Sequence, residues 1–127
     1  MKLPLLFLCI LVLSIFVTAC SNTNNIEEFP LSDTKPTLLV FCNNTDVSCF
    51  DLEYIATHLK DQFGEESLST IYLFVDGVYG ARIFEILDLP NIPSYVVFSS
   101  EQEEVYRSSG DVDLDELDIV FSDLLSN

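Results

Sequence analysis

Short apolar runs alternate with helical repeats along the chain from residue 37 onward. Thr37–Cys42, Thr70–Val75 and Ser94–Phe98 are continuous apolar segments, a pattern typical of strands that are buried on both faces. A polar turn, Ser99–Gln102, separates the third run from Glu103–Arg107, which predicts a fourth strand paired with the third as a hairpin.

Apolar residues at helical spacing predict a helix after each of the first two strands and another after the hairpin. The first helix begins after Asp46 or Ser48, either of which could cap it, carries Phe50 on its apolar face and ends at Gly64. The three predicted helices span residues 47–63, 79–87 and 111–125. The order strand, helix, strand, helix, hairpin, helix predicts an α/β domain, a mixed four-strand sheet with helices on both faces.

The first nineteen residues differ from the rest of the chain. Lys2 precedes an apolar run, Leu3–Val17, that suits a secretory signal peptide and is short for a transmembrane helix. The run ends in Val-Thr-Ala-Cys, which resembles a bacterial lipobox whose cysteine, Cys20, carries lipid, including palmitate, after cleavage. We therefore expect a signal peptide over residues 1–19, a lipidated Cys20 with a flexible linker over 20–36, and one domain over 37–127.

This leader implies that the domain lies in the bacterial cell envelope. Lipid on Cys20 would hold it at the membrane, facing the periplasm, and Ser21 resembles an outer-membrane sorting signal of Gram-negative bacteria. The alternative is an uncleaved N-terminal anchor in which Cys20 is incidental. Both interpretations tether the domain outside the cytoplasm.

The charge of the chain excludes some partners. Five Lys and Arg residues against 21 Asp and Glu give a formal charge of −16, which argues against binding nucleic acid or adsorbing to anionic lipid by charge. No sequence motif indicates a cofactor or a metal ion. We expect a monomer that contacts an envelope protein.

The four cysteines fall into two groups. Cys9 would leave with the signal peptide, and Cys20 would carry lipid. Cys42 and Cys49 remain, in a compartment that permits disulfides.

Several positions between Thr37 and Leu125 resemble the thioredoxin-like family. The segment Ile92-Pro93-Ser94 before an apolar strand resembles the family's Ile-Pro-Thr, in which the proline is cis. Asp76, Gly110 and the spacing from Phe41 to Cys49 also match the family. The resemblance implies that Pro93 lies beside the active-site sulfurs and that the backbone next to it, at Ile92, binds the substrate chain.

The family's Cys-x-x-Cys motif falls here on Asp46-Val47-Ser48-Cys49, so Asp46 replaces the first cysteine, and another cysteine stands at Cys42. Three interpretations remain open. The pair Cys42 and Cys49 is a redox-active disulfide of a thiol–disulfide oxidoreductase, a structural disulfide in a non-catalytic protein-binding domain, or two inert buried thiols.

Three further patterns favour structural roles. The acids of Asp111–Glu116 resemble a calcium loop, but Asp113 is better placed to cap a helix. His58 is expected to be a solvated surface residue, because no second ligand is evident. Four aromatic residues of the second predicted strand and of the helix after it are expected to belong to the core: Tyr72, Phe74, Tyr79 and Phe84.

Overall fold

The computed structural model describes residues 31–126. These residues form four strands and three α-helices, with a short 3₁₀ helix before the first α-helix. The elements are β1 (Thr37–Cys42), η3 (Cys49–Leu52), α2 (Glu53–Phe63), β2 (Ser69–Phe74), α3 (Val78–Ile86), β3 (Ser94–Phe98), β4 (Glu104–Ser109) and α4 (Leu114–Leu125). This order is the one that the apolar runs and helical repeats predict.

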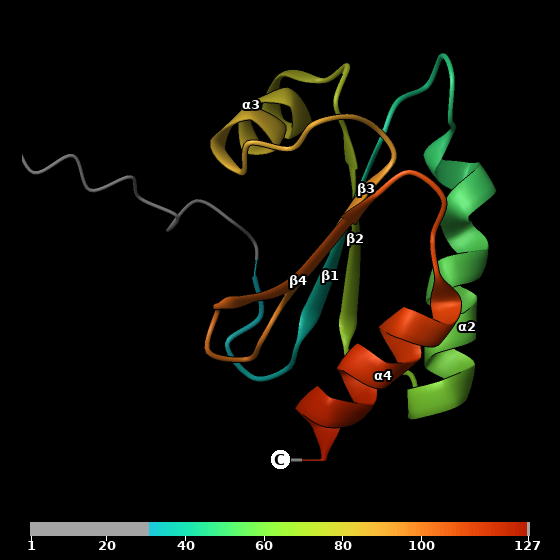
Figure 1. Ribbon diagram of the computed structural model, residues 1–127, viewed down its shortest axis with the longest axis vertical. Helices are drawn as coiled ribbons and strands as arrows, with labels where there is room; N and C mark the ends of the chain where they lie inside the picture. Colours follow the sequence, from blue (N-terminus) through green and yellow to red (C-terminus); the bar gives the residue numbers. More distant parts are fainter. Residues whose placement is uncertain (1–30, 127) are drawn as a thin grey trace, which may run out of the picture. The chain divides into compact units, whose positions relative to one another are not determined.

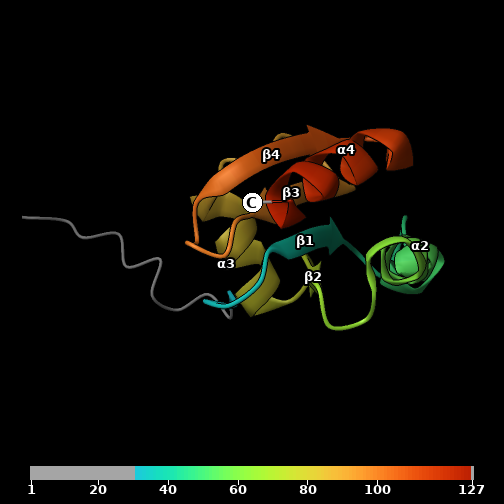
Figure 2. The ribbon, with the colours of Figure 1, turned by 90° about the horizontal axis from the view of Figure 1, so that it is seen from below.

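The four strands form one mixed sheet in the order β2-β1-β3-β4, and Figure 2 shows them side by side. β1 is parallel to β2 and antiparallel to β3, and β3 pairs with β4 as an antiparallel hairpin. β1 is therefore central, and all six of its residues are buried. The predicted fold class, a mixed four-strand sheet with helices on both faces, is confirmed.

Alternate residues of β1 contribute to two cores, because successive side chains of a strand point to opposite faces. Leu38, Val40 and Cys42 belong to the larger core, which α2 and α4 close. Phe41 lies on the other face, where its ring centroid is 5.8 Å from that of Phe84 in α3. Figure 1 shows α3 on one side of the sheet and α2 with α4 on the other.

Two expectations about burial are wrong. The second strand was expected to be buried on both faces, but β2 lies at the edge of the sheet and only Leu73 of its six residues is buried. Phe50 was expected on the apolar face of a helix, but the chain forms a 3₁₀ turn there and 78% of Phe50 is exposed.

Residues at the helix ends behave as their side chains predict. Asp113 accepts a hydrogen bond from the Glu116 amide and caps α4, which confirms the capping interpretation. Gly64 follows α2 with a φ of 94°, a conformation that residues with a Cβ rarely adopt. Between residues 31 and 126, no helix combines the length and apolar character needed to cross a membrane.

Candidate functional site

Cys42 and Cys49 form a disulfide at the end of the central strand. Cys42 is the last residue of β1 and Cys49 the first of η3, and their Cα atoms are 5.6 Å apart, within the usual range for a disulfide. Cys42 has no exposed surface, whereas Cys49 is 6% exposed. The interpretation of two separate thiols is therefore wrong.

A polar turn between the two cysteines brings Cys49 back to the end of β1. The Asn43 side-chain oxygen accepts hydrogen bonds from the amides of Thr45, Asp46 and Val47, at 2.8–3.3 Å. The Asn43 amide donates to the Val47 carbonyl at 3.1 Å. Ser48, rather than Asp46, caps η3 by accepting from the Phe50 amide at 3.2 Å.

The loop before β3 ends beside the disulfide. The peptide bond between Ile92 and Pro93 is cis, as the resemblance implies. Phe41 pairs with Ser94, so Cys42, the last residue of β1, and Pro93, which directly precedes β3, lie at the same end of the sheet. Both Ile92 and Pro93 are half-buried.

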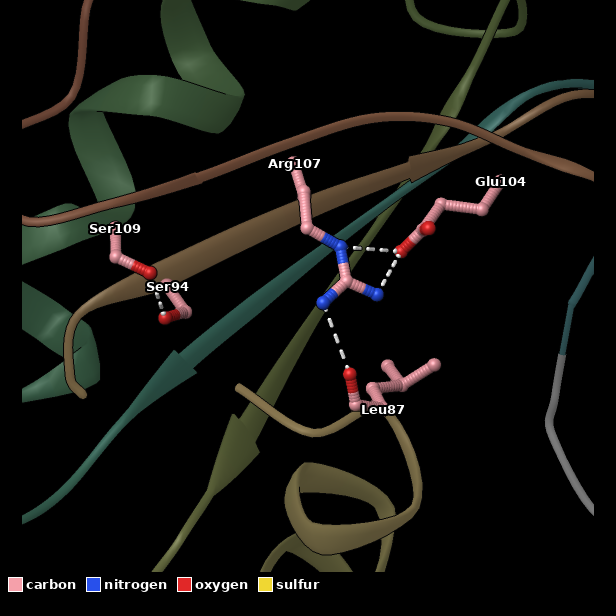
Figure 3. A network of polar contacts seen from close by, with 5 residues as sticks. All are labelled: Leu87, Ser94, Glu104, Arg107 and Ser109. Atoms are coloured by element: carbon pink, nitrogen blue, oxygen red, sulfur yellow. Dashed lines mark hydrogen bonds and ion pairs between the residues drawn. The ribbon is translucent and has the colours of Figure 1, made fainter. Parts of the chain in front are cut away.

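Hydrogen bonds from Ser94 in β3 and from Gly110 after β4 hold the proline loop, Asn91–Pro93. The Gly110 amide donates to the Pro93 carbonyl at 2.8 Å, and the Ser94 hydroxyl donates to the Asn91 carbonyl. The hydroxyls of Ser94 and Ser109 are 2.7 Å apart across β3 and β4 (Figure 3). The loop is therefore attached to both strands of the hairpin.

An arginine of β4 reaches the end of α3 on the same side of the hairpin. Arg107 donates from one nitrogen to the Leu87 carbonyl at 2.9 Å and from its two other nitrogens to the Glu104 carboxylate (Figure 3). Leu87 directly follows α3. Arg107 therefore links the edge strand β4 to Leu87, where the segment between α3 and the proline loop begins.

A pocket of about 260 Å³ opens on the β2 side of the disulfide. It is lined by Cys49, Phe50, Glu53, Tyr72 and Phe74. The Tyr72 hydroxyl donates to the Leu52 carbonyl at 3.0 Å, and burial raises the pKa of this phenol. This hydrogen bond ties the edge strand to the turn that carries Cys49.

Part of the aromatic set expected in the core lies at the surface instead. Phe74 is 36% exposed and Tyr79 is 46% exposed, whereas Tyr72 and Phe84 are half-buried. Tyr72 and Phe74 were missed as pocket residues, because only the pairing of β2 at the sheet edge leaves their face open.

The domain is similar to solved thioredoxin structures. A mutant thioredoxin from Halobacterium salinarum shares 20% identity at a TM-score of 0.60, covering 74% of this chain and 78% of that one. The oxidised thioredoxin O2 of Arabidopsis thaliana shares 16% identity at a TM-score of 0.58, covering 72% and 76% of the two chains. The domain has the thioredoxin-like fold.

A third solved structure agrees on the fold. A protein of the thioredoxin-like superfamily matches this thioredoxin-like chain with a TM-score of 0.61 and 11% identity over 75% of its residues and 82% of that chain. No protein-family model and no curated protein matches the sequence. The thioredoxin-like fold is therefore seen in the structure and not in overall sequence similarity.

The thioredoxin-like domain also contains a hydrogen bond between two helices that the sequence does not predict. His58 of α2 lies 2.8 and 3.0 Å from the two carboxylate oxygens of Asp118 in α4. His58 lies at the surface, as expected, with 32% of its side chain exposed, but its contact with this carboxylate was not predicted. The two residues are 60 positions apart, and no local pattern links them.

One candidate residue cannot be placed in this thioredoxin-like domain. Cys20, the expected lipidation site, lies outside the described residues, as do the expected signal peptide and the first part of the linker. Their roles stay predictions from the sequence.

Proposed function

We propose that the domain is a thiol–disulfide redox module whose reacting group is the Cys42–Cys49 disulfide. The observation that carries this proposal is the position of the disulfide, at the sheet end shared with Pro93 and beside an open pocket that Cys49 lines. Ile92 and Pro93 are assigned to the groove that holds the partner's chain, because they are half-buried and precede β3 at the sheet end where Cys42 lies.

In the proposed reaction, a partner thiolate attacks the sulfur of Cys49, which is the more accessible of the two. A mixed disulfide between the partner and Cys49 forms, the Cys42–Cys49 bond breaks, and its electron pair goes to the sulfur of Cys42. The resulting Cys42 thiolate takes its proton from the second partner thiol. A second partner thiolate attacks the partner's sulfur and releases Cys49, so one partner disulfide forms and the domain is left as a dithiol.

A second candidate is a non-catalytic protein-binding domain in which the disulfide is structural. The complete burial of Cys42 favours it, because a leaving thiolate there would have no contact with water. Asp46 also stands where the thioredoxin family has its exposed cysteine. Under both candidates, the Cys42–Cys49 pair therefore differs from the Cys-x-x-Cys pair of the thioredoxin family.

The redox potential of the disulfide separates the two candidates. The protein is equilibrated in dithiol–disulfide buffers, and the alkylated peptide containing Cys42 and Cys49 is quantified by mass spectrometry. A midpoint above about −300 mV supports exchange, whereas a lower value is typical of a structural disulfide.

Oxidation of a dithiol substrate tests the activity directly. We expect the oxidised wild type to convert the dithiol to its disulfide, and the Cys42→Ser and Cys49→Ser variants to lose this activity. Equal inactivity of the wild type and both variants would remove the redox proposal and leave the binding domain.

We also propose that the module is a lipoprotein of the bacterial cell envelope, tethered through Cys20 to a membrane and acting on an envelope protein. The support is the apolar segment that ends in Val-Thr-Ala-Cys. A Cys20→Ala variant should remain unprocessed and should not incorporate labelled palmitate, whereas Cys49→Ser should be processed normally. Normal processing of Cys20→Ala would contradict the lipoprotein proposal.

A further inference from the structure

The pocket beside Cys49 combines an acid with exposed aromatic walls. Phe50 is 78% exposed and Phe74 is 36% exposed, and both line the pocket together with Glu53. Such exposed aromatic surface next to a reacting group is typical of a contact site for another molecule. It lies on the β2 side of β1, whereas the Pro93 loop lies on the β3 side.

The charged residues nearest in sequence to those that line this pocket are acidic. The segment from Cys42 to Leu59 contains Asp46, Asp51 and Glu53 and no Lys or Arg. β2 and the turn after it add Asp76 and again no basic residue. Within residues 31–126 the Glu53 carboxylate makes no ion pair, so a cation from outside can approach it.

Lysine and arginine side chains match both properties of the pocket. Their alkyl stems bury readily against apolar surface while the charged group stays at its edge. A cation beside an aromatic ring is also attracted by the electrons of the ring face. An acidic side chain would instead be repelled by Glu53.

We propose that this pocket binds a lysine or arginine side chain that flanks the partner's reacting cysteine. The alkyl stem packs against Phe50 and Phe74, and the charged group pairs with Glu53. This inference rests on the proposed exchange at Cys49 and names the partners that the exchange selects. The bonds formed and broken are those of the proposed reaction, with the partner thiol as the reductant and the Cys42–Cys49 disulfide as the oxidant.

Blocked tripeptides with identical flanks test the inference without depending on chain direction. Lys-Cys-Lys, Ser-Cys-Ser and Glu-Cys-Glu are mixed with the full chain in its oxidised form at equal thiolate concentrations. Reduction of the Cys42–Cys49 disulfide is followed by alkylation and mass spectrometry of the peptide that contains it. We expect the rate constants to fall in the order Lys-Cys-Lys, Ser-Cys-Ser, Glu-Cys-Glu.

Four variants assign any preference to the pocket rather than to the net charge. Glu53→Gln should lower the rate ratio of Lys-Cys-Lys to Ser-Cys-Ser by about two- to fivefold, the range of a surface ion pair. Glu65→Gln removes the same charge beyond the far end of α2, about 15 Å away, and should leave the ratio unchanged. Phe50→Ala should also lower the ratio, whereas Ile119→Ala, which removes another exposed apolar side chain, should not.

The outcomes distinguish this inference from the proposed function. In one outcome, all three peptides reduce the disulfide while the rate ratio of Lys-Cys-Lys to Ser-Cys-Ser is the same in Glu53→Gln, Glu65→Gln and wild type. That result would overturn the selectivity and leave the exchange function intact. No reduction of the disulfide by any peptide would overturn the exchange function and the selectivity with it.

Discussion

At the scale of single residues, Tyr95 shows how burial alters the chemistry of a side chain. It is 1% exposed in the core between β3 and the helices α2 and α4. Burial raises the pKa of its phenol to about 12, and the nearby Tyr54, Asp111 and Tyr72 add to the shift. The neutral phenol is therefore favoured in the folded state more than in the unfolded state.

This shift predicts a loss of stability in alkali. An unfolded tyrosine ionises near pH 10, so the contribution of Tyr95 is complete below about pH 10 and is lost as the pH rises towards 12. Urea unfolding at stepped pH should show this fall, of order 2 kcal/mol, and Tyr95→Phe should make it shallower. Tyr72 and Tyr106, whose pKa values are also raised by burial, would account for the loss of stability that remains in Tyr95→Phe. A fall of wild-type steepness in Tyr95→Phe would contradict the assignment.

At the scale of elements, α3 packs directly on the end of β2. Gly80 of α3 is buried, and a Cβ atom at this position would overlap the backbone carbonyl of Phe74. Because that neighbour is backbone, it cannot move aside as a flexible side chain would. The glycine therefore permits the close approach of this helix to the edge strand.

Substitution of Gly80 tests the approach. In a solvated helix, Gly→Ala is favourable by about 1 kcal/mol, but here we expect Gly80→Ala to lower the free energy of unfolding by about 1–3 kcal/mol. Gly77→Ala is the matched control, because its Cβ would lie 3.4 Å from the same carbonyl oxygen, an ordinary contact. Urea denaturation of both variants gives the comparison, and a stabilised Gly80→Ala would show that α3 does not pack this closely.

At the scale of the whole molecule, the disulfide connects the central strand to the helical layer. Cys42 and Cys49 both belong to the core that α2 and α4 close, and seven positions separate them in the chain. The bond restricts the unfolded chain as well as joining two parts of the folded one. It therefore contributes to stability under both candidate functions.

Reduction should lower the free energy of unfolding by about 2–3 kcal/mol, the value for so short a closed loop. Urea unfolding with and without a dithiol reductant measures the difference. The double variant Cys42→Ser with Cys49→Ser should show no response to the reductant. A wild-type domain equally stable in both conditions would mean that the disulfide contributes nothing to folding.

Much of the fold could be predicted from local patterns in the sequence. The apolar runs Thr37–Cys42 and Ser94–Phe98 coincide with β1 and β3 as observed, and Asp113 and Gly64 mark helix ends. These signals are local, because burial on both faces, helical periodicity and capping each depend on residues a few positions apart. The resemblance around Pro93 added the cis peptide bond, which composition alone would not indicate.

The candidate site depended on contacts between distant residues, which only the tertiary structure decided. The composition of β2 predicts a buried strand, but β2 lies at the edge of the sheet. The order in which the strands pair decides which strands flank β2, and its own composition does not. That position opens the pocket, leaves Phe74 exposed and gives Cys49 its contact with the surface. The pairing of His58 with Asp118 likewise requires two helices to meet. The sequence by itself thus determined the elements and their order, whereas packing decided which faces stay open, because exposure depends on elements far apart in the chain.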